Sequence, residues 1–252
     1  MTLKNQTVLV TGGSRGLGLG LVEALVQEGA KVAVVARNQE SLALAKERLG
    51  VATITADITD QTAATRILSS VRPNVLVLNA GAVPRLGQIH EMSWSDFSSA
   101  WETDVKGGLY WIQAALNLPL APGTRVLLSS SGAAQQGSPL SGGYAGAKRM
   151  LWFLTKYAET VAQQKGLKIR FQSLLPLQVV GGTGVGDEAS KAYASHLGLD
   201  RESYLERFGS PLPPRLFGEH VISILTDPQY ASALALGLKG DSGITILEDL
   251  AA

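Results

Sequence analysis

The sequence predicts a single-domain α/β fold, with a doubly wound parallel sheet and helices on both faces. Short apolar runs without polar alternation recur along the chain, which is typical of strands buried on both faces of a parallel sheet. Segments with apolar residues at helical spacing lie between these runs, and right-handed crossovers place such helices on both sides of a sheet. A chain of 252 residues can form one larger α/β domain, and we expect a single domain over residues 1–252.

The expected elements alternate from the N-terminus. The first apolar run, Val8 to Val10, predicts a strand that ends in a glycine-rich turn and leads into a helix near residues 17–28. The later apolar runs predict strands at residues 32–36, 52–56, 75–78, 126–128 and 168–171. The amphipathic segments between them predict helices near residues 39–49, 60–71, 94–118 and 142–165.

The last third of the chain is less regular. Residues 181–186 are rich in glycine, residues 187–208 have a helical pattern, and a proline-rich break follows at residues 210–214. An insertion of this kind near the end of such a sheet predicts a substrate lid over residues 183–216, although a solvated loop is the simpler alternative. Two further elements complete the predicted fold, a helix near residues 218–226 and a strand within residues 233–238.

Composition excludes several classes of function. The net charge is +1 without basic or acidic runs, so we expect neither nucleic acid nor a membrane surface as a partner. The absence of cysteine excludes disulfides and thiolate catalysis, and the three scattered histidines lack metal-ligand spacing. The N-terminus lacks the apolar core of a signal peptide, and no apolar run approaches the ~20 residues of a membrane span, so we expect a cytoplasmic protein.

The turn from Thr11 to Gly18 is the first candidate binding site. A strand that ends in glycines can turn tightly, and without a Cβ the backbone can be approached closely by a pyrophosphate. The helix that follows directs its unpaired N–H groups and the positive end of its dipole at the phosphates. The arrangement predicts a dinucleotide site of the Rossmann type, with a plain strand-to-helix turn as the alternative.

Tyr144 and Lys148 are the candidate catalytic pair. They lie four residues apart at the start of a predicted helix, so both side chains can point to the same side. A neighbouring cation favours a phenolate and lowers the pKa of a phenol toward the working range, which predicts Tyr144 as a general acid or base. Ser131, thirteen residues earlier at the end of a predicted strand, can hydrogen-bond a substrate oxygen at the carboxyl edge of the sheet.

Five motifs in this order resemble the short-chain dehydrogenase/reductase family, in its classical subfamily, over nearly the whole chain. They are Thr11-Gly12-x-x-x-Gly16-x-Gly18, Asp57, Asn79-Ala80-Gly81, Ser131 and Tyr144-x-x-x-Lys148. The resemblance implies NAD or NADP as the cofactor, Ser131 as the group that polarises the substrate, and Tyr144 as the proton donor or acceptor. It implies that Lys148 binds the nicotinamide ribose and lowers the tyrosine pKa. It also implies a set of cofactor-binding residues: Gly12, Ser14, Arg15, Gly16, Leu17, Gly18, Arg37, Asp57, Ile58, Asn79, Ala80, Gly81, Tyr144, Lys148, Pro176 and Val179.

Two positions depart from the family pattern. Asp104 stands where the family usually has an Asn that supports a proton relay to the Lys, and we include Asp104 among the catalytic residues. We expect it to be ionised, while a protonated carboxyl that imitates Asn is the alternative. Leu177 follows Pro176 where the family tends to have Pro-Gly. The family pattern therefore does not define the nicotinamide-side loop here, and Thr183 is only a candidate contact to the carboxamide.

Cofactor choice is expected to depend on Arg37, just after the second strand. A basic residue there pairs with the 2′-phosphate of NADP, whereas an acidic one accepts from the ribose of NAD. Arg15 can approach the same phosphate from the glycine-rich turn, and two guanidinium groups suit a phosphate dianion. The sequence therefore predicts NADP(H).

The leading hypothesis is an NADP(H)-dependent oxidoreductase that interconverts a carbonyl and an alcohol by hydride transfer. The alternative is an NADP-binding protein of low turnover with a regulatory or interaction role, since a fold and a cofactor site do not guarantee chemistry. An epimerase or dehydratase is disfavoured, because that branch of the family adds a C-terminal domain for which this chain has no room. The predicted lid carries a mostly apolar set of side chains: Val185, Tyr193, His196, Leu197, Leu199, Tyr204 and Phe208. This set predicts a small, mostly apolar carbonyl or alcohol as the substrate. We interpret His196 as a packing residue.

Self-association is the last expectation from the sequence. Residues 109–112 and 151–154 each place four consecutive apolar residues on a helix, which spreads them around most of its circumference. One face of each helix can pack against the sheet. The apolar side chains on the remaining faces need a second protein surface to bury them. We expect a homodimer or homotetramer, with rings half buried under neighbouring loops as the alternative.

Overall fold

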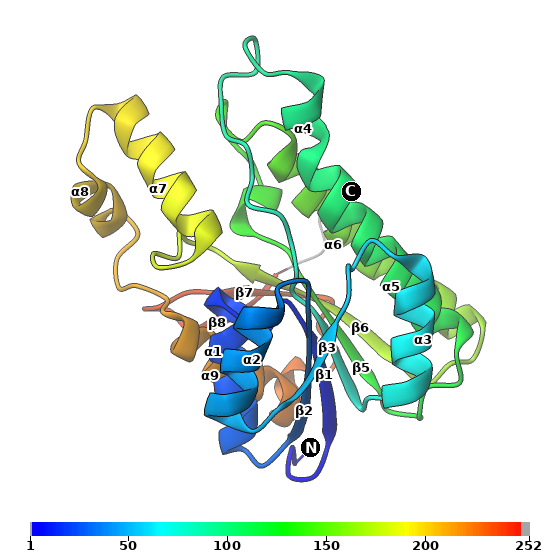
Figure 1. Cartoon of the computed structure of the whole chain (residues 1–252). Coiled ribbons are helices and arrows are strands. Elements are labelled where there is room, and N and C mark those ends of the chain that lie inside the picture. The colour runs from blue at the N-terminus through cyan, green and yellow to red at the C-terminus, as the bar shows by residue number, and fades with distance from the viewer. Residues whose placement is uncertain (1, 248–252) are drawn as a thin grey trace.

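The apolar runs of the sequence pair side by side in one sheet. The structure is a computed structural model that describes residues 2–247, and its strands are β1 (Thr7–Thr11), β2 (Lys31–Ala36), β3 (Ala52–Thr55), β4 (Val75–Leu78), β5 (Arg125–Ser129), β6 (Arg170–Pro176), β7 (Ala235–Leu238) and β8 (Ile244–Leu247). Their order is β3-β2-β1-β4-β5-β6-β7-β8, with every neighbouring pair parallel except β7 and β8 (Figure 1). The predicted doubly wound sheet is confirmed, and the antiparallel strand β8 is an addition.

Both faces of the sheet are buried, as the non-alternating strands predict. On β1, Val8 and Val10 join one core cluster while Leu9 joins the other. The first cluster is covered by α1 (Gly16–Gln27), α2 (Gln39–Leu49) and α9 (Pro214–Thr226), and the second by α3 (Gln61–Val71), α5 (Lys106–Asn117) and α6 (Gly143–Gln164). Because β1 pairs with both β2 and β4, the chain reverses its direction of winding beside β1, and this switch point is where such sheets bind ligands.

The expected helix over residues 94–118 is interrupted. It consists of α4 (Trp94–Ala100), the π-helical turn η1 (Trp101–Val105) and α5. Apolar periodicity does not distinguish a single π turn from α-helix, because the residues on either side keep a helical spacing. π turns occur frequently at functional sites, and this one contains Asp104.

The predicted lid helix over residues 187–208 is also divided. Its parts are α7 (Gly184–Leu197) and α8 (Arg201–Glu206). Gly198 ends α7 in the left-handed conformation with φ of 67°, and Asp200 caps α8 by accepting a hydrogen bond from the Ser203 N–H. The break between α7 and α8 therefore has local causes, which the helical spacing over residues 187–208 does not indicate.

Two other boundaries move. The helix α9 begins at Pro214 rather than near residue 218, because proline is tolerated in the first turn of a helix. The strand β6 extends to Pro176, well beyond the predicted residues 168–171, although Gln172 and Ser173 interrupt its apolar run. Their side chains are satisfied inside the core: the Gln172 amide donates to the backbone oxygens of Tyr230 and Ala233, and the Ser173 hydroxyl pairs with Thr155 at 2.7 Å.

Candidate active site

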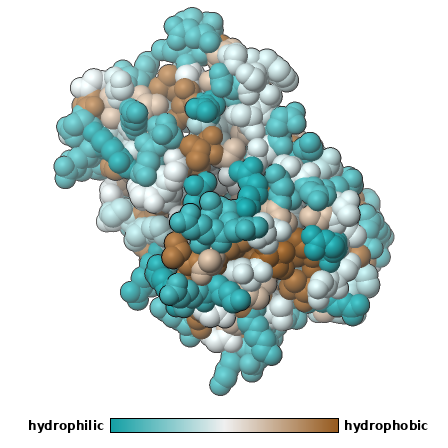
Figure 2. All heavy atoms as spheres, viewed as in Figure 1, coloured by the Kyte–Doolittle hydropathy of each residue, from teal (hydrophilic) through white to brown (hydrophobic). Residues whose placement is uncertain are grey.

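A cavity of about 1150 Å³ opens at the carboxyl ends of the parallel strands, between the sheet and the segment with α7 and α8. Figure 2 shows this hollow on the face where α7 and α8 lie beside the strand ends. Four of the seven lid residues named from the sequence line the cavity: Val185, Tyr193, Tyr204 and Phe208. Leu197, Leu199 and His196 do not, and all three are exposed, so the interpretation of His196 as a packing residue is wrong.

The glycine-rich turn forms one end of the cavity. Gly12 has φ of 69°, and a Cβ there would lie 2.7 Å from the Ala80 Cα, so the position needs glycine. A Cβ on Gly18 would lie 2.2 Å from the Gly12 oxygen, and Gly18 itself does not line the cavity. Gly18 therefore lets α1 pack closely against the turn. The bare turn at a helix N-terminus fits a dinucleotide pyrophosphate, and the lining residues are Gly12, Ser14, Arg15, Gly16 and Leu17.

Asp57 is not part of the cavity lining, whereas Arg37 and Ile58 are. The Asp57 carboxylate accepts hydrogen bonds of 2.8 Å from both the N–H and the hydroxyl of Thr59, and Arg37 Nη1 lies 3.8 Å from it. The Thr59 N–H is the main cause of a lowered pKa of Asp57, and Arg37 lowers it further. Arg37 itself is 67% exposed, so its guanidinium is accessible to a bound phosphate.

The first turn of α2 completes this end of the cavity, which the sequence analysis missed. Glu40, Ser41 and Leu44 line it, and the Ser41 hydroxyl donates to the Ser14 hydroxyl at 3.1 Å. The hydrogen bond ties the second crossover to the glycine-rich turn. Ser41 lies four residues after Arg37 in the sequence, and its proximity to Ser14 arises only when β1 and β2 pair.

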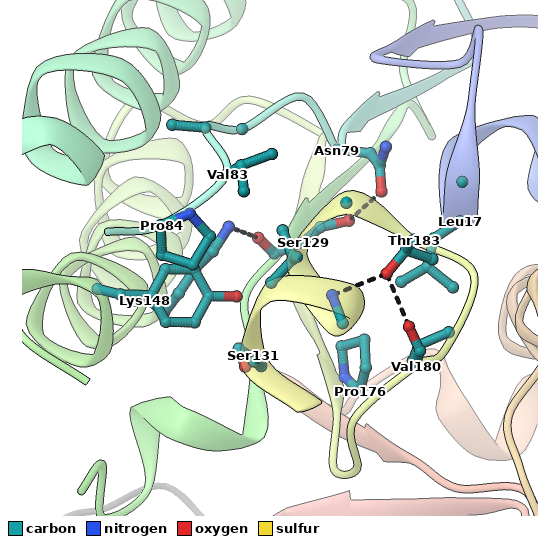
Figure 3. A pocket seen from close by; sticks show the side chains of 18 of the residues that line it. Leu17, Asn79, Val83, Pro84, Ser129, Ser131, Lys148, Pro176, Val180 and Thr183 are labelled. Carbon is teal, nitrogen blue, oxygen red and sulfur yellow. Dashed lines mark hydrogen bonds between the residues drawn. The ribbon is translucent and has the colours of Figure 1, made fainter. Parts of the chain in front are cut away.

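The Asn79 side chain links the carboxyl end of β1 to that of β5 at the cavity wall. Its amide donates to the Gly12 oxygen at 3.4 Å and its carbonyl accepts from the Ser129 hydroxyl at 3.3 Å, as Figure 3 shows for the second contact. The Thr11 hydroxyl accepts from the N–H groups of Asn79 and Ala80. These contacts fix Asn79, Ala80 and Gly81 at the cavity wall.

Ser131, Tyr144 and Lys148 meet on one wall of the cavity. Ser131 follows β5 and caps the short helix η2 (Gly132–Ala134), so its hydroxyl oxygen accepts from the Ala133 N–H at 3.2 Å. Tyr144 lies in the first turn of α6, and the Lys148 Nζ lies 5.6 Å from the centre of its ring. Figure 3 shows Ser131 and Lys148 at the same side of the cavity. The structure thus brings together the three residues that carry the predicted chemistry.

Asp104 lies behind Lys148 and outside the large cavity. Its Oδ2 is 2.9 Å from the Lys148 Nζ, and its Oδ1 accepts from the Ala82 N–H at 2.7 Å. The two side chains are 1% and 8% exposed. Burial disfavours the ammonium, but the Asp104 carboxylate and Tyr144 together outweigh it and raise the pKa of Lys148. Lys148 and Asp104 thus form a buried pair, and the ionised form of Asp104 expected from the sequence stays a prediction.

The nicotinamide-side loop has a defined structure despite its departure from the family pattern. Pro176, Val179 and Thr183 line the cavity. The Thr183 hydroxyl donates to the Val180 oxygen at 2.8 Å and accepts from the Gly186 N–H at 3.0 Å, so it caps α7 (Figure 3). Gln178, which follows Leu177, is buried and bonds the backbone of Ser210 and Gly240. The loop is therefore anchored to the proline-rich segment before α9 and to the turn after β7.

Within residues 2–247 no group of three or more histidine, aspartate or glutamate side chains is arranged to hold a metal ion. None of the helices described there has the length and apolar character that a membrane span requires.

Comparisons with known proteins agree with this geometry. A family model described as short chain dehydrogenase matches residues 6–194. The sorbitol dehydrogenase of Cereibacter sphaeroides is 28% identical over 222 residues, covering 84% of this chain and 85% of that protein. The NADPH-dependent pterin aldehyde reductase of Arabidopsis thaliana is 30% identical over 169 residues, covering 63% and 69% respectively. A crystal structure of NAD+-bound xylitol dehydrogenase shares the fold, with a TM-score of 0.84 at 20% identity over 95% of this chain and 100% of that one.

Proposed function

The chain belongs to the short-chain dehydrogenase family, and from this premise we propose that it is an NADP(H)-dependent oxidoreductase that interconverts a carbonyl and an alcohol by hydride transfer. One observation carries the proposal: Ser131, Tyr144 and Lys148 line the same cavity as the glycine-rich turn. A dinucleotide with its phosphates at that turn and a substrate at Tyr144 would share one cavity. The proposed substrate is small and mostly apolar, since Val83, Pro84 and Val185 contribute to the wall.

The roles of the three residues follow from their chemistry. In the direction of reduction, the Ser131 hydroxyl donates a hydrogen bond to the carbonyl oxygen, and the Tyr144 hydroxyl gives its proton to that oxygen as the alcohol forms. We expect the Lys148 ammonium, which pairs with Asp104, to stabilise the phenolate that remains and to bind the ribose. When bound, the nicotinamide supplies the hydride. Oxidation of the alcohol reverses each step.

A cofactor-oxidation screen tests the proposal. Purified protein is incubated with NADPH and a panel of ketones, aldehydes and quinones, and the loss of reduced cofactor is followed by absorbance. Turnover of at least one carbonyl compound supports the oxidoreductase. Tight NADPH binding without oxidation by any compound, or by the alcohols in reverse, favours the alternative of a binding protein of low turnover.

Cofactor preference gives a first prediction. Arg15 and Arg37 both line the cavity, and a charge-assisted hydrogen bond to phosphate contributes about 1.5–3 kcal/mol. We therefore expect the wild type to bind NADPH more tightly than NADH, and Arg37→Ala to weaken NADPH binding by roughly tenfold or more without changing NADH binding. Titration calorimetry measures both affinities.

Arg48→Ala is the matched control, because Arg48 lies on the helix that follows Arg37, α2, and pairs with Glu23 outside the cavity wall. It is expected to leave both affinities unchanged. Equal affinity of the wild type for NADPH and NADH contradicts the proposal. The similar proteins differ in their cofactor, since the plant reductase is NADPH-dependent and the xylitol dehydrogenase binds NAD+.

Self-association gives a second prediction. Trp111, Ile112, Leu151 and Trp152 of the predicted apolar runs are buried, whereas Leu109 on α5 is half exposed. On α6 the exposed apolar side chains are Phe153, Tyr157 and Val161, with the rings of Phe153 and Tyr157 stacked at 6.1 Å. The helices α5 and α6 lie side by side (Figure 1). We propose that this surface forms a homodimer or homotetramer interface.

Light scattering at micromolar concentration is expected to report a multiple of 26.5 kDa for the wild type. Phe153→Glu places a charge in the proposed interface and is expected to shift the protein toward the monomer. Leu199→Glu, on the exposed side of the lid, serves as the control and is expected to keep the wild-type mass. A monomeric wild type contradicts the prediction.

A further inference from the structure

Three hydroxyl groups form a cluster on the cavity wall, where α7 meets the loop between η2 and α6. Ser138 and Ser141 precede α6, and Tyr193 comes from α7. The Ser138 and Ser141 oxygens are 3.2 Å apart, the Ser141 and Tyr193 oxygens are 3.3 Å apart, and Ser138 also hydrogen-bonds Tyr193. All three residues line the cavity that contains Tyr144. We refer to Ser138, Ser141 and Tyr193 as the hydroxyl cluster.

The cluster lies within one helical turn of the proton donor. The Tyr144 N–H donates to the Ser141 backbone oxygen at 3.0 Å, and the Ser141 N–H donates to the Ser138 backbone oxygen at 3.0 Å. These turns fix both serines relative to Tyr144. The Tyr193 ring is fixed from the other side, because it stacks on Tyr204 with ring centres 5.8 Å apart.

The hydrogen-bond inventory of the cluster determines what it can bind. Each hydroxyl has one proton and two lone pairs, so a ring of three mutual hydrogen bonds uses every proton. The Ser138 oxygen additionally accepts from the Leu140 N–H at 3.2 Å. The cluster therefore keeps one lone pair on the Ser141 oxygen and one on the Tyr193 oxygen, and no free proton. It can accept from a ligand hydroxyl, whereas a carboxylate, a phosphate or a carbonyl could bind only after the ring breaks.

The charges around the cavity agree with a neutral ligand at this place. Among the residues described by the structure, the cationic side chains that line the cavity are Arg15, Arg37 and Lys148. Arg15 and Arg37 belong to the glycine-rich turn and the end of β2, and Lys148 is paired with Asp104. The cavity wall next to the cluster is formed by Gln135, Gln136 and Gly137, which carry no charge.

We propose that the hydroxyl cluster is a subsite for a second oxygen of the substrate, and that it accepts a hydrogen bond from a substrate hydroxyl. The preferred substrates are then small ketones or aldehydes that carry one hydroxyl group, and the corresponding diols in the direction of oxidation. This inference rests on the proposed oxidoreductase function and narrows its substrate class. It adds one polar anchor to a cavity that is otherwise mostly apolar at the lid.

Matched pairs of ketones test the subsite. Hydroxyacetone is compared with methoxyacetone, and 4-hydroxy-2-butanone with 4-methoxy-2-butanone, since a methoxy group can accept a hydrogen bond but cannot donate one. We expect wild-type kcat/KM to favour the hydroxyl member of at least one pair by about fivefold to tenfold, the effect of one hydrogen bond. Tyr193→Phe opens the ring, and it is expected to reduce that ratio toward one.

A second variant and a control separate binding from folding. Ser138→Ala removes a different member of the cluster and is expected to reduce the same ratio, while Ser195→Ala removes an exposed hydroxyl of α7 outside the cavity and is expected to keep the wild-type ratio. If Tyr193→Phe lowers kcat/KM for both members equally, the cluster only holds the lid and the proposal is overturned. Reduction of 2-butanone without any preference for hydroxyl groups overturns the subsite alone. Failure of every ketone to oxidise NADPH overturns the proposed function as well.

Discussion

Tyr144→Phe is expected to lower kcat by about 10²- to 10⁴-fold, the usual contribution of a general acid or base. The substitution removes the only group at the cavity wall that we propose to exchange a proton with the substrate oxygen. It leaves the ring, and therefore the packing of the first turn of α6, in place. NADPH affinity is expected to change little, because the proposed phosphate contacts lie at the other end of the cavity. Steady-state kinetics and calorimetry on the same preparation measure the two effects.

Tyr157→Phe is the matched control for this prediction. Tyr157 belongs to the same helix but is 53% exposed on the surface away from the cavity. Its turnover is expected to match that of the wild type. A Tyr144→Phe variant with wild-type kcat contradicts the assigned role, and a variant that loses NADPH binding shows that the tyrosine acts in cofactor binding instead.

Asp104→Leu is expected to destabilise the protein by about 3–5 kcal/mol, which is the usual cost of leaving one partner of a buried ion pair uncompensated. Lys148 is almost fully buried, and the Ala82 N–H loses its acceptor in the same variant. Urea unfolding of wild type and variant measures the difference. Because the folded state raises the pKa of Lys148, the stabilisation is complete below the ordinary lysine value and is lost as the pH rises through the raised value. The difference between the two proteins is therefore expected to shrink in strongly alkaline buffer.

Asp104→Asn is the conservative variant for the same position. The amide oxygen can still accept from the Ala82 N–H and lie beside the ammonium, so we expect folding and turnover to persist. Loss of the negative charge leaves the field of Lys148 on Tyr144 uncompensated, which favours the phenolate. For alcohol oxidation, the rise of activity with pH is expected to occur at lower pH than in the wild type. An unchanged profile supports a protonated Asp104, and an inactive Asn variant shows that the carboxylate has a further role.

Much of the fold could be predicted because it depends on local patterns. The non-alternating apolar runs specify strands buried on both faces, and the turn from Thr11 to Gly18 needs glycine for backbone reasons that are visible in the chain itself. The spacing of Tyr144 and Lys148 is a property of one helix, so their common direction follows from helical geometry alone. The sequence was also sufficient to predict that Ser131 would stand at the carboxyl edge of the sheet.

Tertiary structure decided which side chains from distant segments meet. The Asp104 and Lys148 pair depends on the π turn η1, which packs against α6. The hydrophobic periodicity of the sequence indicates neither this turn nor this contact. The hydroxyl cluster joins α7 to a loop more than fifty residues earlier. The strand β8 forms because β7 offers a free edge to pair with. Periodicity determines local conformation and burial, whereas these contacts depend on strand order and on packing between elements, which no local pattern contains.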